Sequence, residues 1–590
     1  MNVLLATLNA KYIHSSLALR YLAASCRSVC PDIMISEYSI NNKLLDVLGD
    51  IYAQQPAIVG LACYIWNIDL TLSLARLIKQ VMPDTVIVLG GPEVSYDPGY
   101  LLDTYPCVDY VIQGEGEETL AQLIAAMAAG DIVDSINGLA ARGTDGKPIV
   151  DEPQVVTELD TIPFPYSQAD LAALKGKIIY YESSRGCPFS CQYCLSSATN
   201  GVRFFSLERV FQDLQTFIAA GVQQVKFVDR TFNANKNHYL PILRFLAAQN
   251  CSTNFHLEVA ADCLDEEALV VLEQAPVGRF QLEIGIQSTH EQTLTAIQRR
   301  NIWPRLTENI QRLQTADNMH LHLDLIVGLP CENYERFGVS FDDVYRLRPH
   351  MLQIGFLKML KGSGIRRQAV AHGYVFTDYA PYEVLQNNYL SYHDVRRLQL
   401  LEEVFNQTYN SGRFEQTLAW LVEKSDHSPF RLYEKITDYW ECHDYHRMAH
   451  SAKSVSKYLL DFCREKYKTE TDFCAELLKF DALTSDGGRV RPDYLPWQHD
   501  TWQHEYNRFW GNAAIVLRYI CGYSFTTWRE VKRLYQIEVF STAVVSRVAN
   551  SAMTGADKIA VLFDYSGSAV KWTVIANGDF FGEDQDKNAL

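Results

Sequence analysis

The stretch Ser184-Arg185-Gly186-Cys187-Pro188-Phe189-Ser190-Cys191-Gln192-Tyr193-Cys194 is the most distinctive in the chain. Its cysteines are separated by three and then two residues, so their thiolates can converge on one side of a compact loop, and Gly186 and Pro188 favour the turns this loop needs. Thiolates are typical ligands of zinc and of iron–sulfur clusters. No Cys or His follows within the next ~15 residues to complete a structural zinc site. Three ligands on a cubane cluster leave one iron open to a substrate, although structural zinc and incidental buried cysteines stay as alternatives.

The cysteine loop follows the first of six predicted strands that alternate with helices. Apolar runs predict the strands, and apolar residues at helical spacing predict the helices between them. The predicted strands are 178–182, 224–228, 254–259, 279–284, 322–327 and 352–356, and the predicted helices include 207–219, 239–248, 266–273 and 305–316. Six strand–helix units are fewer than the eight of a closed barrel. The sequence therefore predicts an open, partial barrel.

The spacing Cys187-x-x-x-Cys191-x-x-Cys194, with Tyr193 before the last cysteine, resembles the signature of the radical S-adenosylmethionine (radical SAM) enzymes. Their partial (β/α)6 barrel, related to the TIM barrel, agrees with the six predicted units. The resemblance implies that the three cysteines ligate three irons of a 4Fe-4S cluster and that S-adenosylmethionine binds the fourth through its amino and carboxylate groups. Electron transfer into the sulfonium would then release a 5′-deoxyadenosyl radical.

Further residues near the predicted strand ends match the family. By resemblance, Tyr193 contacts the adenine, although packing beneath the loop is an equal alternative. Strand ends at one mouth of a barrel can converge on one site. The candidate S-adenosylmethionine ligands are Tyr193, Asp229, Asn233, Glu258, Glu283 and Gln287. The stretches 282–288 and 324–330 resemble the cobalamin-associated branch of the family, but Cys331 stands where a glycine is expected after Leu329-Pro330.

Residues 1–150 also alternate between strand and helix. Predicted strands at 3–8, 34–36, 58–62, 86–89 and 110–112 indicate a doubly wound α/β domain of the Rossmann type, whose ligands bind beyond the carboxyl ends of the strands. Glycines at those ends would let the backbone approach a bulky ligand. The series resembles a cobalamin-binding domain. The candidate cobalamin contacts are Tyr64, Trp66, Asn67, Gly90, Gly91, Pro92, Glu93, Gly114, Glu115 and Gly116.

The loop after the first strand departs from the cobalamin pattern. Where proteins that replace the lower axial base carry Asp-x-His-x-x-Gly, this chain has Asn9-Ala10-Lys11-Tyr12-Ile13-His14-Ser15-Ser16. His14 lies in the corresponding loop without the Asp that would orient an imidazole ligand. A helix-start or surface role is therefore favoured for His14. Cobalamin bound without a protein ligand to cobalt, and a domain that has lost the cofactor, are both open.

Length and composition set the domain count and the class of protein. At ~100–200 residues per domain, 590 residues suggest about three domains. We expect a cobalamin-binding-type domain at 1–150, a proline-containing linker at 151–174, the radical SAM core at 175–370 and a mainly helical domain of unknown function at 371–590. In this last region the pair 559–563 and 570–574 is a possible late strand pair. The aromatic residues near Trp502 and Trp510 suggest a helical core or, alternatively, a lid.

Charge and terminal sequence indicate the compartment. The chain has 53 Lys and Arg against 70 Asp and Glu, a formal net charge of −17, which disfavours non-specific binding to nucleic acid. We find no specific nucleic-acid signal. No basic segment followed by a long apolar run opens the chain, and no apolar stretch of ~18 residues occurs, so we expect a cytoplasmic protein without a membrane anchor. Its 14 cysteines should be reduced there.

The resemblance implies cobalamin-dependent methylation of an unactivated carbon. The expected cofactors are a 4Fe-4S cluster, S-adenosylmethionine and cobalamin, and the expected electron donor is a protein such as flavodoxin or ferredoxin. The substrate is a small molecule or a modified biopolymer, whose identity the sequence does not give. The first alternative is a radical cyclase, oxidase or rearrangement enzyme without methyl transfer. The second is an iron–sulfur or corrinoid-binding regulator.

Overall fold

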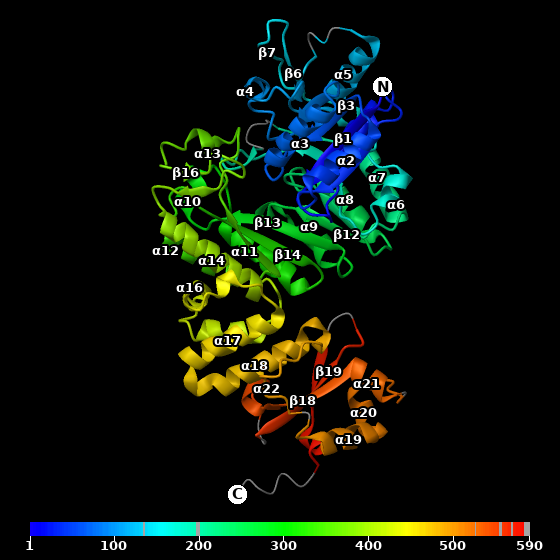
Figure 1. Cartoon of the computed structure of the whole chain (residues 1–590). Helices are drawn as coiled ribbons and strands as arrows, with labels where there is room; N and C mark the ends of the chain where they lie inside the picture. Colours follow the sequence, from blue (N-terminus) through cyan, green and yellow to red (C-terminus); the bar gives the residue numbers. More distant parts are fainter. Residues whose placement is uncertain are drawn as a thin grey trace. The chain divides into compact units, whose positions relative to one another are not determined.

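The computed structural model describes residues 1–582 except 132, 134, 135, 196–200, 499, 526, 554–556, 568 and 569. The chain divides into two compact units, Met1–Val395 and Arg396–Leu590, and the boundary falls within helix α14 (Tyr392–Thr408). Figure 1 shows the course of the chain through both units. None of the described helices is long and apolar enough to cross a membrane.

The first unit begins with a seven-stranded sheet in the order β2-β1-β3-β4-β5-β6-β7. Its strands are β1 (Val3–Asn9), β2 (Met34–Ser39), β3 (Ile58–Ala62), β4 (Val86–Gly90), β5 (Tyr110–Ile112), β6 (Leu139–Arg142) and β7 (Pro148–Val150). The first five are parallel, as the sequence predicts, and β6 and β7 are antiparallel additions that it does not. The doubly wound fold is therefore confirmed.

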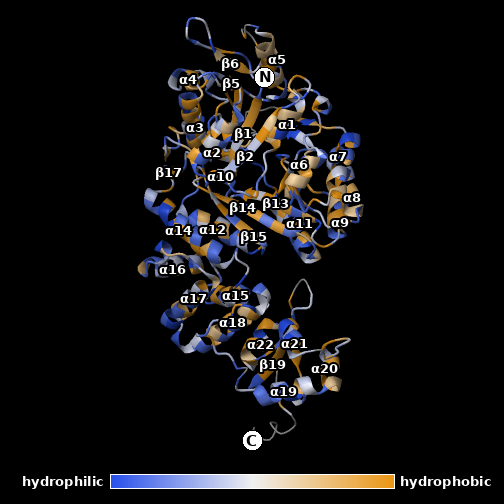
Figure 2. Ribbon diagram, turned by 45° about the vertical axis from the view of Figure 1, so that its right-hand side comes forward, coloured by the Kyte–Doolittle hydropathy of each residue, from blue (hydrophilic) through white to orange (hydrophobic). Residues whose placement is uncertain are grey.

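Helices cover both faces of this sheet because side chains alternate along each strand. Leu4, Ala6 and Leu8 of β1 belong to one core cluster with α2 and α3, whereas Val3 and Leu5 belong to the opposite cluster with α1 and α5. Hydrophobic residues are concentrated on the central strands (Figure 2). The helices are α1 (Leu17–Cys26), α2 (Leu44–Gln54), α3 (Ile68–Val81), α4 (Pro98–Thr104) and α5 (Glu117–Ala129).

A six-stranded parallel sheet follows in the order β15-β14-β13-β12-β11-β8, which confirms the predicted six-unit partial barrel. Its strands are β8 (Ile179–Tyr181), β11 (Gln224–Phe227), β12 (Asn254–Glu258), β13 (Phe280–Gln287), β14 (His320–Val327) and β15 (Met351–Phe356). The helices are α7 (Leu207–Ala219), α8 (Lys236–Ala248), α9 (Glu266–Glu273), α10 (Glu291–Ala296), α11 (Trp303–Ala316) and α12 (Tyr334–Tyr345).

Short elements complete the first unit. The predicted linker contains the short helix α6 (Gln168–Ala173), and the chain after the barrel forms α13 (Gly364–Arg367) and the antiparallel pair β16 (Val375–Phe376) and β17 (Val384–Gln386). The cysteine loop leaves β9 (Ser184–Gly186) and returns as β10 (Val202–Phe204), with which β9 pairs antiparallel. The loop is thus closed at its base by its own two-stranded sheet.

The second unit is mainly helical, as predicted, but contains a three-stranded antiparallel sheet in the order β18-β19-β20. Its elements are α15 (Glu415–Glu423), α16 (Pro429–Cys442), α17 (Ala452–Lys466), α18 (Thr471–Thr484), α19 (Gln503–Gly511), α20 (Ala513–Tyr519), α21 (Trp528–Leu534), β18 (Tyr535–Ser541), α22 (Thr542–Val548), β19 (Lys558–Asp564), β20 (Lys571–Ile575) and α23 (Asn577–Phe580). The late strand pair is present. Tyr506, Phe509 and Trp510 belong to the core of this unit.

A buried ion pair joins α18 to β18 inside the second unit. Lys479 Nζ lies 3.3 Å from Glu538 Oε1 and donates to the carbonyl of Val539 at 2.7 Å, and both charged side chains are almost fully buried. Removing one partner leaves an unpaired buried charge, so Lys479→Met should lower the free energy of unfolding by about 3–5 kcal/mol in urea titrations. Lys453→Met at the exposed Lys453–Asp493 pair is the control, for which less than about 1 kcal/mol is expected. Equal effects of the two substitutions would contradict the prediction.

Candidate active site

The three cysteines of the loop line one cavity of about 180 Å³ at the carboxyl end of the barrel strands. Cys187 and Cys191 are more than nine-tenths buried, and the backbone N–H of Cys194 donates to the carbonyl of Cys191 at 3.0 Å. Cys187 Sγ lies 3.5 Å from Thr231 Oγ1, which follows β11. The structure therefore gathers the predicted cysteines from a short loop around a common space.

Acidic side chains from adjacent strands face the same cavity. Glu258, Glu283 and Asp324, from β12, β13 and β14, all line it. Burial raises the pKa of Glu258 to about 7, and the charge of Glu283 adds to this shift. For Glu283 burial acts in the same direction, but the hydrogen bond from His256 and the charge of Lys226 outweigh it and lower the pKa to about 2. Glu283 is therefore charged near neutral pH, whereas the neighbouring Glu258 can take up a proton there.

Four of the six predicted S-adenosylmethionine ligands line this cavity, namely Tyr193, Glu258, Glu283 and Gln287. The other two, Asp229 and Asn233, are buried outside its lining. Asp229 accepts hydrogen bonds from Ser183 N and Ser183 Oγ at 2.9 and 2.7 Å. Asn233 exchanges two hydrogen bonds with the backbone of Ala260. Both side chains therefore fix the loops around the cavity.

Gln287 has an unpaired buried atom at the cavity wall. Gln287 lies where β13 shifts register against β14, its φ is +72°, and its Oε1 is buried without a hydrogen-bond partner among the described residues. A buried polar atom without a partner is costly. An amide oxygen beside three thiols and acidic side chains suits a ligand with hydrogen-bond donors, such as the amino group of S-adenosylmethionine, so the residues present fit that group.

Arg299 is a site residue that the sequence does not predict. Its Nη1 donates to Tyr193 Oη at 2.9 Å and lies 3.8 Å from Cys191 Sγ. Its Nη2 contacts the carbonyl oxygen of Gly285. Burial raises the pKa of the Cys191 thiol, and the charge of Arg299 opposes that shift. Arg299 therefore favours negative charge on the sulfur of Cys191.

A second charged group lies inside the barrel. Ligand atoms of Glu283, His322 and Asp324 lie within 4.8 Å of one another, a separation at which such atoms can bind a metal ion. Lys226 Nζ, however, lies 2.9 Å from Glu283 Oε2 and His322 Nε2 lies 3.1 Å from Asp324 Oδ1. The carboxylates are therefore already paired with positively charged or titratable groups, and we assign no metal to them.

A larger cavity of about 630 Å³ lies at the carboxyl ends of the strands of the amino-terminal sheet. Leu5, Val88 and Ile112 line its inner part, and α1 and α5 contribute Leu22 and Leu120. Tyr180 and Val228 of the barrel line it too. The cavity therefore lies between the two domains of the first unit, at the edge of the sheet where doubly wound folds bind ligands.

Glycines keep this cavity open. Gly60, Gly90 and Gly116 line it. A Cβ built on Gly60 would lie 2.7 Å from Leu5 Cδ2, and one on Gly116 would lie 3.1 Å from Ile112 Cγ2. A Cβ on Gly90 meets no atom closer than 3.9 Å, so a side chain there would enter the cavity space. An apolar slot lined by glycines fits a bulky, flat group such as the nucleotide part of cobalamin.

Seven of the ten candidate cobalamin contacts line the larger cavity: Tyr64, Trp66, Gly90, Gly91, Gly114, Glu115 and Gly116. Tyr64 and Trp66 stack with ring centroids 4.5 Å apart. Asn67, Pro92 and Glu93 are not part of the lining. Asn67 Nδ2 donates to the carbonyl oxygens of Leu8 and Ala62, and Glu93 contacts Tyr382 Oη and lies 3.2 Å from Lys361 Nζ.

His14 also lines the larger cavity, and its Nδ1 lies 2.7 Å from Tyr180 Oη. Burial and the charges of Lys11 and Lys226 lower its pKa, which favours the neutral imidazole. The partner of Nδ1 is thus a tyrosine hydroxyl of the barrel and not a carboxylate of the same loop. The contact ties the loop after β1 to strand β8 of the barrel.

Three family models match separate parts of the chain. Residues 181–344 match the model described as Radical SAM superfamily, and residues 3–124 match the B12 binding domain. Residues 370–563 match a protein of unknown function, DUF4080. The first match contains the cysteine loop, and the second contains the glycines that line the larger cavity.

Curated relatives include enzymes with different reactions. An uncharacterized methyltransferase of Pyrococcus horikoshii is 26% identical over 371 residues, 61% of this chain and 80% of that protein. The cobalamin-dependent radical SAM methyltransferase TokK of Streptomyces tokunonensis is 27% identical over 48% of this chain and 44% of TokK. An anaerobic magnesium-protoporphyrin IX monomethyl ester cyclase of Synechocystis is 29% identical over 38% of this chain and 46% of that protein. The chain thus spans less than half the length of the last two.

Solved structures resemble the fold over most of the chain. The cobalamin-dependent S-adenosylmethionine radical enzyme OxsB matches with a TM-score of 0.59 and 14% identity, covering 84% of this chain and 82% of OxsB. The radical S-adenosylmethionine methyltransferase TsrM from Kitasatospora setae matches with a TM-score of 0.54 and 16% identity, covering 63% of this chain and 77% of TsrM. At these identities the likeness concerns the fold alone.

Proposed function

Because the chain belongs to the radical SAM superfamily and carries an amino-terminal B12 binding domain, we propose that it is a cobalamin-dependent methyltransferase acting on an unactivated carbon. One observation carries this proposal. The segment that follows β11 lines both cavities, since Val228 lines the larger and Arg230, two residues on, lines the smaller. A substrate held between them would face the contents of both.

The residues of the two cavities divide the binding tasks. Cys187, Cys191 and Cys194 would hold the cluster, and Tyr193, Glu258, Glu283 and Gln287 would contact S-adenosylmethionine. The glycine-lined wall with Tyr64 and Trp66 would hold cobalamin. Asn67, Pro92 and Glu93 would shape the loops of that wall, and Asp229 and Asn233 would shape the loops around the smaller cavity. When bound, these groups supply reductive cleavage of S-adenosylmethionine and a transferable methyl group. The protein positions them and excludes water.

Arg299 would tune the cluster through the sulfur of Cys191, since hydrogen bonds to cluster sulfurs shift reduction potentials. Arg299→Met removes a positive charge that stabilises the reduced cluster, so the reduction potential of the reconstituted cluster should become more negative. A tenfold change in the equilibrium between oxidised and reduced cluster corresponds to a shift of about 59 mV. A redox titration followed by electron paramagnetic resonance measures the shift. Arg300→Met, at the exposed neighbouring position, is the control, and an unchanged potential in the Arg299 variant would refute this role.

Product analysis tests the proposed reaction. Anaerobically reconstituted protein with hydroxocobalamin, S-adenosylmethionine, a low-potential reductant and a substrate panel should form both 5′-deoxyadenosine and S-adenosylhomocysteine, because methyl transfer consumes a second S-adenosylmethionine. 5′-Deoxyadenosine alone would favour the alternative without methyl transfer, which the likeness to the cyclase supports. If neither product forms, the proposal that the protein is an enzyme is wrong, and the iron–sulfur or corrinoid-binding regulator is the alternative that stays.

The remaining proposals concern the electron donor, the substrate class, the cellular compartment and the domain divisions. An electron donor such as flavodoxin or ferredoxin would reduce the cluster, and the substrate would be a small molecule or a modified biopolymer. A reducing compartment suits an oxygen-sensitive cluster and free cysteines, so we place the protein in the cytoplasm. We also retain 1–150, 151–174, 175–370 and 371–590 as functional divisions, the last without an assigned role.

A further inference from the structure

The loop that carries the three cysteines has a tightly fixed base. Arg185 of β9 lies directly opposite Arg203 of β10 in the antiparallel pairing. Gly186 has a φ of +103°, and a Cβ on it would lie 2.2 Å from the carbonyl oxygen of Gly201, so a side chain at this position would displace the backbone at the base of the loop. Cys187 is the next residue. A shift of this base would therefore be transmitted directly to a cluster ligand.

Both arginines of the base bind one carboxylate of the amino-terminal domain, Glu115. Arg203 Nη1 donates to Glu115 Oε2 at 2.9 Å and its Nη2 contacts Oε1, while Arg185 Nη1 lies 3.3 Å from Oε2. The backbone N–H of Val156 donates to the same carboxylate at 2.7 Å. Like charges directly opposite on paired strands repel each other. Because Glu115 pairs with both arginines, it reduces that repulsion at the base of the loop.

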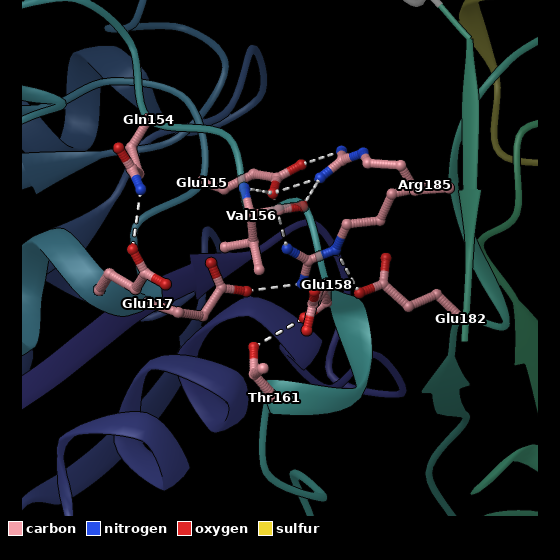
Figure 3. Close-up of polar contacts among 10 residues, drawn as sticks. Glu115, Glu117, Gln154, Val156, Glu158, Thr161, Glu182 and Arg185 are labelled. Carbon is pink, nitrogen blue, oxygen red and sulfur yellow. Dashed lines mark hydrogen bonds and ion pairs between the residues drawn. The ribbon is translucent and has the colours of Figure 1, made fainter. Parts of the chain in front are cut away.

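Arg185 also binds two further carboxylates, as Figure 3 shows. Its Nη2 lies 2.6 Å from Glu117 Oε1 and its Nε lies 2.8 Å from Glu182 Oε1, with only 12% of its side chain exposed. Burial would raise the pKa of Glu115, but the hydrogen bond from Arg203 and the charge of Arg185 lower it overall. Glu115 is thus held as an anion, the form that both guanidinium groups require.

The same charged group forms part of the wall of the larger cavity. Glu115, Glu117, Glu182 and Arg185 all line it, and Glu115 stands between two glycines that line it too. A bulky ligand in that cavity would contact the loop of Glu115. Any change in that loop changes the support of the cysteine loop, because Glu115 is the point at which both arginines meet.

We propose that Glu115 couples the two cavities. When cobalamin fills the larger cavity, its contact with residues 114–116 would stabilise the paired position of Glu115, and through Arg185 and Arg203 the position of the cysteine loop that binds S-adenosylmethionine. This inference rests on the function proposed above. Each ligand then strengthens the binding of the other by the same factor, and coupling between sites typically amounts to about 5–150-fold. Glu115, Arg185 and Arg203 are positioning residues in this scheme.

Binding measurements test the coupling without a substrate. S-adenosylmethionine is titrated calorimetrically into anaerobically reconstituted protein, with the cluster oxidised so that no cleavage occurs, in the absence and in the presence of saturating hydroxocobalamin. Cobalamin should tighten the binding of S-adenosylmethionine at least about fivefold in the wild type. In Glu115→Gln the ratio should fall to near one while iron content stays unchanged, because the neutral amide cannot hold both arginines.

Two further variants serve as controls. Glu118→Gln removes a neighbouring carboxylate that contacts Gln154 and neither arginine, and it should keep the wild-type ratio. Arg203→Lys keeps the charge but loses the two-pronged contact with Glu115, and its ratio should lie between those of wild type and Glu115→Gln. It also provides the test if Glu115→Gln does not fold.

The outcomes separate this inference from the proposed function. If wild-type protein binds both ligands independently of each other, the coupling is refuted while the proposed function stands. If Glu115→Gln or Arg203→Lys keeps the full wild-type ratio, the assignment to Glu115 is wrong. If wild-type protein binds neither hydroxocobalamin nor S-adenosylmethionine, it is the proposed function that fails.

Discussion

Replacing Cys187, Cys191 or Cys194 singly with Ala is expected to abolish reductive cleavage of S-adenosylmethionine. Each cysteine lines the cavity at the barrel mouth, and a cubane cluster with two protein ligands would lose a second coordination position. The protein reconstituted with iron and sulfide should lose its brown absorbance in the triple variant and its 5′-deoxyadenosine production in every single variant. Iron analysis, visible absorbance and product detection measure these losses.

The matched control is another cysteine of the same chain. Cys442 is exposed in the second unit, so Cys442→Ala should keep both absorbance and cleavage at the wild-type level. If the triple variant retained the wild-type absorbance, the cluster assignment would be wrong. If Cys442→Ala lost activity as fully as the triplet variants, general sensitivity to cysteine substitution would account for the effect instead.

The parallel strands could be predicted because their apolar runs are buried on both faces. β3 and the central part of β4 have almost no exposed residue, and their sequences Ile58–Ala62 and Val86–Gly90 are nearly continuous hydrophobic runs. β7, three residues from Pro148 to Val150, lies at the sheet edge and is largely exposed, so it resembles a proline-containing linker. β6 lies between β5 and β7, but only Leu139 and Ala140 in it are buried, so neither β6 nor β7 carries an apolar run long enough to predict a strand.

The candidate site could be predicted where function follows local sequence. The cysteine spacing and the strand ends with Glu258 and Glu283 are local patterns, and these residues share one cavity. Asp229 also lies near the end of a barrel strand, yet its carboxylate accepts hydrogen bonds from Ser183 and Ser184 and does not line the cavity. Arg299 lies after α10, more than 100 residues from Cys191, and its contact depends on packing that no local pattern encodes.

Gly90→Leu is expected to weaken cobalamin binding roughly 5- to 150-fold while leaving the cluster intact. The φ of Gly90 is not in the left-handed region, so the backbone accepts a side chain, and its Cβ has free space around it. The added side chain would occupy part of the cavity that Gly90 lines. With cobalamin bound, the leucine would crowd the ligand, and overpacking of this kind typically costs about 1–3 kcal/mol. That cost corresponds to roughly a 5- to 150-fold weaker affinity for cobalamin. Spectroscopic titration with hydroxocobalamin measures the loss.

The control for Gly90→Leu is the same substitution at an exposed glycine of the same domain. A Cβ on Gly49, in α2, meets no atom within 4 Å, so Gly49→Leu should bind hydroxocobalamin as the wild type does. The three cysteines lie in the other cavity, so Gly90→Leu should still assemble the cluster and cleave S-adenosylmethionine. Coupling between the two cavities would lower the rate of that cleavage. Unchanged cobalamin affinity in Gly90→Leu would show that the ligand binds elsewhere, because a leucine cannot share this space with it.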